Sequence, residues 1–473
     1  MPPTAAQLDH YYRCLYPVQQ VERLLTLKDD PLIQREFAAD GDYYKRYITA
    51  SCAAELRTAL LQVPGLRAPQ IGPVYSGAVT RSGLSGGTME AEHYSRPHRR
   101  ELVFDIDQTD YDFLTDLVAG GGTELDLDAC DKAWPVAGLA VFFLKYVLRE
   151  QFGFEQFLVV YSGRRGVHLW VLDKKAMGLT DEARGAVASA VNFTPDKTKT
   201  RASRSLHQLC CTYEIMDAVR DAFETVLVER MGLLDDLGAR DAFVERIGLK
   251  HDGLSNLADE ASRKPDGKAA WVYIQAKIAD AAKRDSKCGW FTQRLEEVVL
   301  AYVWPRVDFN VTKAVNHLIK SPLVAHPKTG RIAVPIPRGD ILTFDPSCVP
   351  KLGDPNLAEA LASRGCSLVH NISNEPPMVA LDFERRLARA PKAKLVRSKR
   401  RGTPADGERP PPSEDVEDAA STIFPMEVDA PTPPRPREVD RLRRPLAPDD
   451  LRKRAFVPNR PSPLAEGSNT HGR

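Results

Sequence analysis

The most constraining feature of this chain is an alternating stretch, Glu101–Asp110, with the sequence ELVFDIDQTD. Its alternate positions carry the apolar side chains Leu102, Phe104 and Ile106, which is the period of a half-buried β-strand. Asp105 and Asp107 therefore project from the opposite face, at the end of an apolar strand. Crowded carboxylates repel each other and resist desolvation unless a cation lies between them. The stretch predicts either a Mg²⁺ site for phosphate chemistry or a solvated strand end.

Length and composition set broad limits on the rest of the chain. The 473 residues suffice for one large or two ordinary domains plus a tail. A net charge of +1 provides no global basic field, so attraction to nucleic acid would depend on local patches. The chain has neither an apolar run of membrane-spanning length nor a secretory-signal pattern, and we expect no membrane partner. Eight scattered cysteines favour a reducing intracellular compartment.

The N-terminal region predicts helices followed by short strands. Apolar spacing over residues 8–27 is helical, with a break at Pro17. The run Tyr43–Ile48 interleaves aromatic and basic residues, which is typical either of a packed strand with cations reaching solvent or of nucleotide contacts. The further elements expected before the carboxylate strand are a helix at Ala54–Gln62, a strand at Ile71–Ser76 and a loop at 77–98.

A second informative stretch lies between two apolar strand segments, Gln156–Val160 and Leu169–Leu172. Its glycines and paired arginines predict a tight hairpin that presents guanidinium groups. Arginine forks match phosphate oxygens, and glycines allow backbone N–H groups to approach an anion closely. The stretch is therefore either a phosphate-binding hairpin or a charged surface hairpin. Its residues are Ser162, Gly163, Arg164, Arg165, Gly166, Val167 and His168.

Between these two stretches, Gly120–Gly122 predicts a flexible insertion, followed by an acidic cluster of Asp126, Asp128 and Asp131 around Cys130. Three acids and a thiol can ligate a metal, but loop-like flanks without a nearby histidine favour a solvated loop. A buried helix is expected from Val136 to Phe152.

The region 180–300 changes to helical periodicity, which predicts an inserted helical subdomain. The periodicity is clearest over Tyr213–Val228, Ala242–Ile247 and Trp271–Lys283. The basic residues before it form either a solvated loop or a nucleic-acid contact. They are Lys197, Lys199, Arg201 and Arg204.

An alternating pattern returns over residues 303–311 and predicts a strand that carries Asp308. A two-turn helix is expected over Lys313–Lys320, ended by Ser321-Pro322. Residues 323–336 then predict a hairpin that turns at 328–330. This arrangement would bring Lys320 and His326 close to Asp308.

The C-terminal region, from 389 to 473, is rich in proline with acidic and Ser/Thr clusters, and predicts a disordered tail. Its basic run Arg397–Arg401 is either a nuclear import signal or a solvated run. Ile423–Met426 is a lone apolar island that would suit a docking motif.

Three long motifs, at Glu101–Asp112, Tyr161–Trp170 and Pro305–Pro335, together resemble the catalytic small subunit of archaeal and eukaryotic DNA primases. The third is especially similar to the eukaryotic form. Tyr11–Pro17 and Arg35–Phe37 also resemble that family, and the order and spacing match over roughly residues 8–380.

The resemblance implies an α/β fold of the primase type, with a mixed β-sheet core flanked by helices. The catalytic core would comprise residues 1–178 and 301–388, with the helical subdomain at 179–300. It also implies synthesis of short RNA primers from NTPs on single-stranded DNA during replication in the nucleus. The partners implied are the large primase subunit and the catalytic and accessory subunits of DNA polymerase alpha.

Residue by residue, the resemblance places Asp105, Asp107 and Asp308 on the family's Mg²⁺- or Mn²⁺-binding carboxylates, and Glu36 on a further acidic residue of the active site. It places residues 162–168 on the nucleotide-binding hairpin. The remaining positions implied to contact the nucleotide are Arg46, His317, Leu318, Ile319, Lys320 and His326.

The chain also departs from the family's pattern. Eukaryotic members usually carry a cysteine pair and a Cys-x-x-Cys element that bind zinc, but here Leu117-Val118 and Cys130–Ala133 occupy those places. Tetrahedral zinc normally needs four N or S ligands, so we predict no structural zinc. Near the nucleotide sugar, Gln70 replaces an aspartate and Arg67 stands near a family lysine. These changes leave open a primase-polymerase that also uses dNTPs. A non-catalytic scaffold subunit is another alternative, whereas a phosphatase or nuclease would not explain the hairpin.

Overall fold

The computed structural model describes residues 2–77, 79, 96–119, 124–192, 213–249, 251–285, 289–337 and 341–374. The chain divides into two units, Met1–Lys399 and Arg400–Arg473, and all described residues belong to the first. Several predictions concern segments outside the described residues: the insertion Gly120–Gly122, the basic residues Lys197, Lys199, Arg201 and Arg204, and the tail at 389–473 with its basic run and apolar island.

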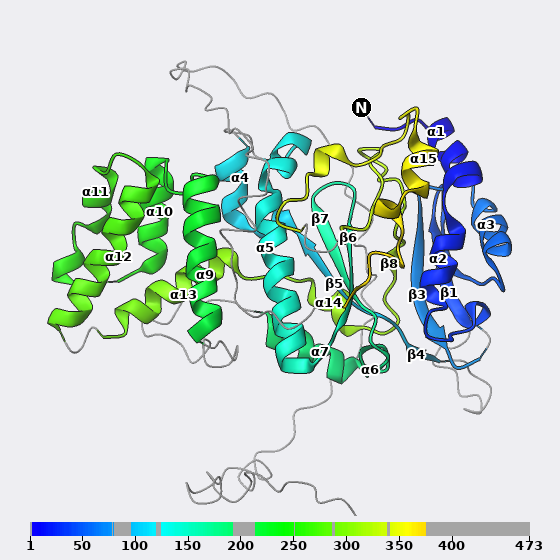
Figure 1. Ribbon diagram of the computed structural model, residues 1–473, viewed down its shortest axis with the longest axis horizontal. Helices are drawn as coiled ribbons and strands as arrows, with labels where there is room; N and C mark the ends of the chain where they lie inside the picture. The colour runs from blue at the N-terminus through cyan, green and yellow to red at the C-terminus, as the bar shows by residue number, and fades with distance from the viewer. Residues whose placement is uncertain are drawn as a thin grey trace, which may run out of the picture. The chain divides into compact units, whose positions relative to one another are not determined.

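The predicted α/β class is confirmed, and the described strands form two sheets in which every pairing is antiparallel. The first sheet has the order β2-β1-β3-β4, with β8 also paired to β3. Its strands are β1 (Arg35–Asp40), β2 (Tyr44–Ile48), β3 (Ala68–Tyr75), β4 (Pro97–Arg99) and β8 (Ile319–Lys320). The second sheet has the order β5-β7-β6-β9 (Figure 1). Its strands are β5 (Leu102–Asp107), β6 (Gln156–Tyr161), β7 (Gly166–Val171) and β9 (Ser373–Asn374).

The N-terminal helices lie beside the first sheet (Figure 1). Thr4 begins the first of them with a capping box, because its side chain accepts from the Gln7 amide and the Gln7 side chain accepts from the Thr4 amide. The predicted break at Pro17 is confirmed, since a π-helical turn ends at Leu15 and α2 begins at Val18. The helices are α1 (Ala5–His10), α2 (Val18–Leu25) and α3 (Ala53–Leu61).

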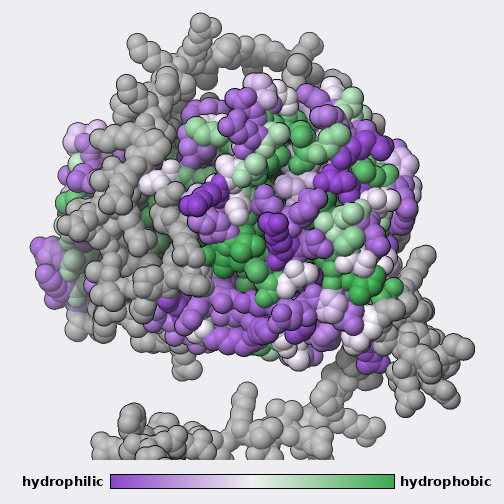
Figure 2. Space-filling view, turned by 45° about the vertical axis from the view of Figure 1, so that its right-hand side comes forward, coloured by the Kyte–Doolittle hydropathy of each residue, from purple (hydrophilic) through white to green (hydrophobic). Residues whose placement is uncertain are grey.

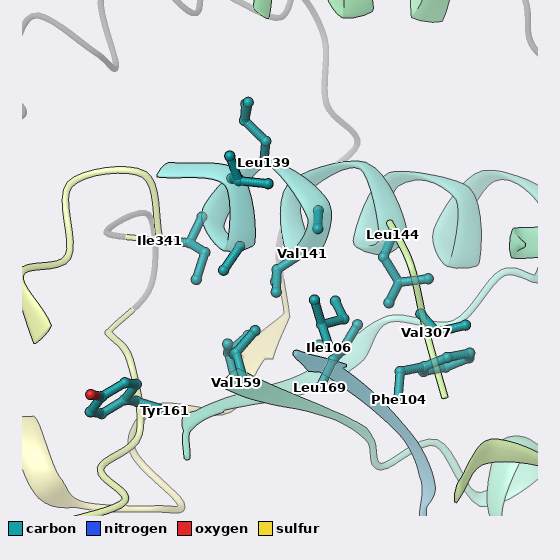
Figure 3. Close-up of a cluster of buried hydrophobic side chains, with 14 of the residues drawn as sticks. Phe104, Ile106, Leu139, Val141, Leu144, Val159, Tyr161, Leu169, Val307 and Ile341 are labelled. Carbon is teal, nitrogen blue, oxygen red and sulfur yellow. The ribbon is translucent and has the colours of Figure 1, made fainter. Parts of the chain in front are cut away.

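Helix α5 (Leu127–Phe152) covers one face of the second sheet (Figure 3). Val141 and Leu144 point from the helix toward Ile106, Val159 and Leu169 on the strands, and all are buried. This packing removes apolar surface from water on the face of β5 opposite to its carboxylates.

The prediction of a solvated loop around the acidic cluster at 126–131 is wrong, because α5 begins there. Asp126 is the N-cap residue, and its Oδ1 accepts from the Ala129 amide at 2.8 Å. A carboxylate at this position satisfies an amide that has no partner within the helix. Asp128 and Asp131 therefore lie in the first turns of the helix, where negative charge is favoured.

The predicted helical character of the region after 180 is confirmed. Its helices are α7 (Asp181–Val191), α9 (Tyr213–Ala222), the π-helix Phe223–Arg230, α10 (Leu237–Ile247), α11 (Leu257–Ser262), α12 (Gly267–Arg284) and α13 (Phe291–Val303). An aromatic cluster of Phe223, Phe243, Trp271 and Tyr302 packs between them. Trp304, which follows α13, donates its Nε1–H to the carbonyl of Val191 at 2.8 Å, so the two ends of this region are joined.

The predicted strand over residues 303–311 and the predicted helix at Lys313–Lys320 are both wrong. Helix α13 continues to Val303, and Asp308 is the N-cap of the short helix α14 (Phe309–Lys313). Residues 304–308 connect α13 to α14, and in this connector Pro305 and Val307 are buried whereas Arg306 and Asp308 are more exposed, so burial alternates without a strand. Ile319 and Lys320 extend the first sheet through β8.

The remaining helices are short: α4 (Asp112–Val118), α6 (Lys174–Met177) and α15 (Leu357–Ala362). No helix in the described ranges is long and apolar enough to cross a membrane. Polar residues occupy much of the face shown in Figure 2, with apolar residues between them. Some large apolar side chains are exposed, such as Leu237 on α10 and Val272 on α12, as is usual on protein surfaces.

We expect Leu169→Ala to lower the free energy of unfolding by about 2–5 kcal/mol, because it leaves a cavity between β7 and α5. Denaturant unfolding followed by circular dichroism measures the change. Val272→Ala on α12 is the control, since that side chain is 52% exposed and its truncation should cost less than about 0.5 kcal/mol. Equal losses in the two variants would contradict the packing described for α5.

Candidate active site

Two aspartates project from the end of β5, as predicted. The antiparallel pairing with β7 sets Asp105 opposite His168 and Asp107 opposite Gly166. Phe104 and Ile106 are fully buried, whereas each aspartate side chain is 33% exposed. The Nε2 atom of His168 lies 3.7 Å from Oδ1 of Asp105. The strand thus buries its apolar residues and leaves its carboxylates accessible.

A third aspartate joins this pair from a distant segment. The amide of Asp308 donates to the carbonyl of Asp105 at 3.0 Å, which fixes the start of α14 against β5. The Oδ1 atom of Asp308 accepts from the amides of Asn310 and Val311 at 2.8 and 3.2 Å. The hydrogen bonds orient the carboxylate, because an N-cap side chain must face the first turn of its helix.

The three carboxylates influence one another's ionisation. Burial and, to a smaller extent, the charges of Asp107 and Asp308 together raise the pKa of Asp105 to about 7. The charges of Lys320 and His317 lower the pKa of Asp105. Since like charges this close disfavour ionisation, the arrangement favours a bound cation.

The structure adds a fourth carboxylate, Asp110, that was not among the predicted site residues. Burial and the charges of Asp107, Asp105 and Asp308 together raise the pKa of Asp110 to about 6. Asp110 ends the one-turn 3₁₀ helix Gln108–Asp110, which directly follows β5. The signal in the sequence was a third aspartate in the same ten-residue stretch.

The donor set fits Mg²⁺ or Mn²⁺, although its oxygens already have partners within the protein. The Oδ1 atom of Asp107 accepts from the amide and hydroxyl of Thr109, and its Oδ2 accepts from Arg165 Nε at 2.9 Å. Among the described residues, no three His, Cys, Asp or Glu side chains are arranged as a preformed metal site. Carboxylate oxygens are the ligands these cations prefer, and a cation would relieve the repulsion that raises the pKa of Asp105.

The predicted hairpin is confirmed between β6 and β7. The hydroxyl of Ser162 accepts from the Gly166 amide at 3.0 Å, and the Ser162 amide donates to the Gly166 carbonyl at 2.9 Å. Gly163 has φ of +96°, and a Cβ there would lie 2.7 Å from the Cβ of His326. Both the conformation and the close contact require glycine. The hydroxyl of Thr329 donates to the Gly163 carbonyl at 2.7 Å, so the hairpin packs against the turn that follows His326.

Cations surround His326. Burial and, to a smaller extent, the charges of Lys320, Arg164, Lys328 and Arg165 together lower its pKa to about 3. The Lys328 amide donates to Nδ1 of His326 at 3.2 Å, which places the ring proton on Nε2. Within the described part of the chain, Arg164 and Lys320 pair with no carboxylate. A neutral imidazole donor among cations is suited to bind a polyanion.

The predicted nucleotide contacts at 317–320 have different surroundings. The Leu318 side chain packs near Gly72, and Ile319 is buried opposite Ile71 in the first sheet. The Nδ1 atom of His317 lies 2.7 Å from the Leu318 carbonyl, which assigns the donating proton to Nδ1. Lys320 is the residue of this run whose charge acts on both Asp105 and His326.

Glu36 lies on β1 and is fully buried. Its carboxylate accepts from Arg46 Nε at 2.8 Å and Nη2 at 3.2 Å, and from the Tyr75 hydroxyl at 2.7 Å. Arg46 also donates to the Asn316 carbonyl at 3.4 Å, next to the 317–320 run. The structure thus places Glu36 as the partner that orients Arg46.

The residues at the family's zinc positions pack in the interior. Val118 ends α4 and is buried, while Leu117 is partly buried against the core. Cys130 lies in α5 with 1% exposure, and burial raises the pKa of its thiol to about 11. A thiol of this kind is a poor metal ligand. The absence of structural zinc stays a prediction.

Comparison with known proteins agrees with the motifs. The family model described as DNA primase small subunit matches residues 104–337. The chain is 30% identical to the DNA primase small subunit of Drosophila melanogaster over 72% of this chain and 78% of the relative. It is 30% identical to that of Schizosaccharomyces pombe over 73% and 75%. The archaeal DNA primase small subunit PriS of Thermococcus kodakarensis is 26% identical over 52% and 66%.

Elemental analysis of the purified chain should find no bound zinc, because Cys130 is the one cysteine left at the family's zinc positions. Inductively coupled plasma mass spectrometry after dialysis against a weak chelator makes the measurement. One tightly held zinc per chain would contradict the prediction.

His326 should remain neutral from about pH 8 to pH 5, since its pKa lies below the usual value near 6.5. The unfolded chain binds this proton more readily, so His326 should lower stability progressively as the pH falls below about 6.5. NMR of labelled histidine measures the protonation of the His326 ring as a function of pH, and His326→Asn assigns its signal. Added pyrophosphate should raise the pKa, because an anion favours the protonated ring. A midpoint near 6.5 without added anion would contradict the described environment.

Proposed function

Because this chain belongs to the DNA primase small subunit family, we propose that it joins ribonucleotides into short RNA primers on single-stranded DNA. Family membership itself supports the role of a DNA primase catalytic subunit in replication. The observation that carries the finer proposal is the meeting of three aspartates, Asp105, Asp107 and Asp308, with a cluster of cations around His326.

The aspartates would hold two Mg²⁺ or Mn²⁺ ions. When bound, such ions lower the pKa of an attacking hydroxyl and neutralise a leaving pyrophosphate. The protein supplies fixed positions: β-sheet pairing holds Asp105 and Asp107, and the amides of α14 orient Asp308. Fixed carboxylates reduce the reorganisation needed during nucleotidyl transfer.

The cation cluster would bind the β- and γ-phosphates of the incoming nucleotide. Arg164 and Lys320 supply positive charge, and Nε2 of His326 supplies a neutral donor. Phosphoryl transfer depends mainly on charge neutralisation and positioning, so these side chains suffice without a covalent intermediate. Arg165 bonds Asp107 and also faces His326, and it therefore links the carboxylates to the phosphate-binding side chains.

Arg46 and His317 would complete the nucleotide site. Glu36 holds Arg46 by two hydrogen bonds, so the guanidinium is oriented before substrate arrives. Burial lowers the pKa of His317, which keeps its ring neutral at physiological pH. His317 follows Asn316, whose carbonyl accepts from Arg46, and its neutral ring adds no further positive charge there.

The proposed partners follow from the family. They are the large regulatory primase subunit, the catalytic and accessory subunits of DNA polymerase alpha, a single-stranded DNA template and NTPs, with the nucleus as the location. We expect the isolated chain to extend a primer more readily than it starts one, because initiation in this family relies on the large subunit to hold the first nucleotide.

The test is primer extension on a single-stranded DNA template with Mg²⁺ or Mn²⁺, comparing NTPs with dNTPs. We expect extension with NTPs. Equal use of dNTPs would indicate a primase-polymerase instead, for which the neutral Gln70, bonded by the Tyr44 hydroxyl at 2.8 Å, is the specific observation. No extension with either set, alone or with a large subunit, would indicate a scaffold.

Asp105→Ala and Asp308→Ala should each reduce extension to below about one-hundredth of wild type, because each removes a carboxylate that would hold the metal ions. Circular dichroism should show a retained fold. Asp217→Ala is the matched control, since that carboxylate is 69% exposed and pairs with Arg220 on α9. Substantial extension by either site variant would overturn the assignment.

A further inference from the structure

An ion pair joins helix α5 to the turn 326–331, which packs against the hairpin 162–166. Arg331 donates from Nη1 and Nη2 to the two oxygens of Asp131 at 2.6 and 2.7 Å, in the parallel geometry that makes such pairs strong. The side chains of Asp131 and Arg331 are 17% and 10% exposed. Because both charges are largely removed from water, loss of either would leave the other without compensation.

Arg331 is bonded to both turns. Its Nη1 donates to the hydroxyl of Tyr161 at 3.2 Å, and this hydroxyl donates to the carbonyl of Arg164 in the hairpin at 2.9 Å. On the other side, the carbonyl of Arg331 accepts from the His326 amide at 2.8 Å, and its amide donates to Thr329 at 3.2 Å. Arg331 therefore connects Arg164, through its guanidinium and Tyr161, with His326, through its main chain.

Helix α5 makes further contacts with the residues that support the hairpin and the strand β5. Trp134, one turn after Asp131, packs edge-to-face on the ring of Tyr161 with centroids 5.7 Å apart. The carbonyl of Cys130 accepts from Gln108 Nε2 at 2.9 Å, next to the strand that carries Asp107. The first turns of α5 thus contact the supports of both the cations and the carboxylates.

We propose that Asp131 is a positioning residue for the nucleotide: through Arg331 it holds the hairpin 162–166 and the turn 326–331 in the spacing that binds the β- and γ-phosphates. The inference rests on the proposed function, since it concerns the same nucleotide site. It assigns Asp131 no contact with substrate. Its effect should therefore appear in nucleotide affinity rather than in the rate at saturation.

The test compares Asp131→Asn with the wild-type chain. The substitution keeps the shape of the side chain and removes its charge, so Arg331 is left uncompensated. The Kd for GTP with Mg²⁺ and the KM for GTP in primer extension should each rise about tenfold, with kcat changed by less than about twofold. Asp128→Asn is the matched control, because Asp128 lies on the same helix, is 74% exposed and pairs with Lys132.

Two further variants separate positioning from general stability. Asp131→Glu retains the charge and should recover most of the affinity that Asp131→Asn loses. In an Arg331→Met background, Asp131→Asn should cause no further rise in Kd, since a coupled pair is not additive.

The inference is overturned if Asp131→Asn lowers the melting temperature but leaves the Kd and KM for GTP unchanged. It is also overturned if Asp128→Asn weakens binding equally. Failure of the proposed function is distinct: wild-type chain that binds GTP but extends no primer would refute primer synthesis, while the Kd series would still report on positioning.

Discussion

The antiparallel pairing of β5 with β7 is the interaction on which the site depends. Its register sets Asp105 and Asp107 on the open face and their apolar neighbours against α5. Because side chains alternate along a strand, a slip of one residue would bury both carboxylates under the helix and expose the core. The same pairing fixes the hairpin, since Gly166 lies opposite Asp107 at the start of β7. One register thus determines both halves of the site.

The two halves of the site have opposite charge. The aspartates repel each other, and the cations around His326 do likewise. Arg165, bonded to Asp107, is the direct link between them. If more of the cations formed ion pairs with the aspartates, fewer positive charges would be left to bind phosphate and fewer carboxylates to bind a metal ion. Arg164 lies in the hairpin between β6 and β7 and Lys320 lies on β8, and neither pairs with a carboxylate of the described residues.

The features that could be predicted from sequence were those determined by local patterns. Alternation identified β5, and glycines beside paired arginines identified the hairpin. Features that depend on tertiary contacts were mistaken or missed. Asp308 was expected on a strand because burial alternates along the connector between α13 and α14 as it would along a strand. The bond between Asp131 and Arg331 joins residues 200 positions apart, and no local pattern encodes such a contact.

The hydrogen bond between Trp304 and Val191 affects how changes of loop length between these residues would alter the stability of the fold. It joins the points where the chain leaves the sheet region and returns to it, so the intervening helices form a closed loop with a fixed neck. The entropy of closing such a loop grows only with the logarithm of its length. A change of length in a loop between these two points would therefore cost little closure entropy, whereas a change within the helices would disturb the buried aromatic cluster of Phe223, Phe243, Trp271 and Tyr302. Because Trp304 is held at the neck, a change of loop length is not passed on directly to Asp308, which follows four residues later.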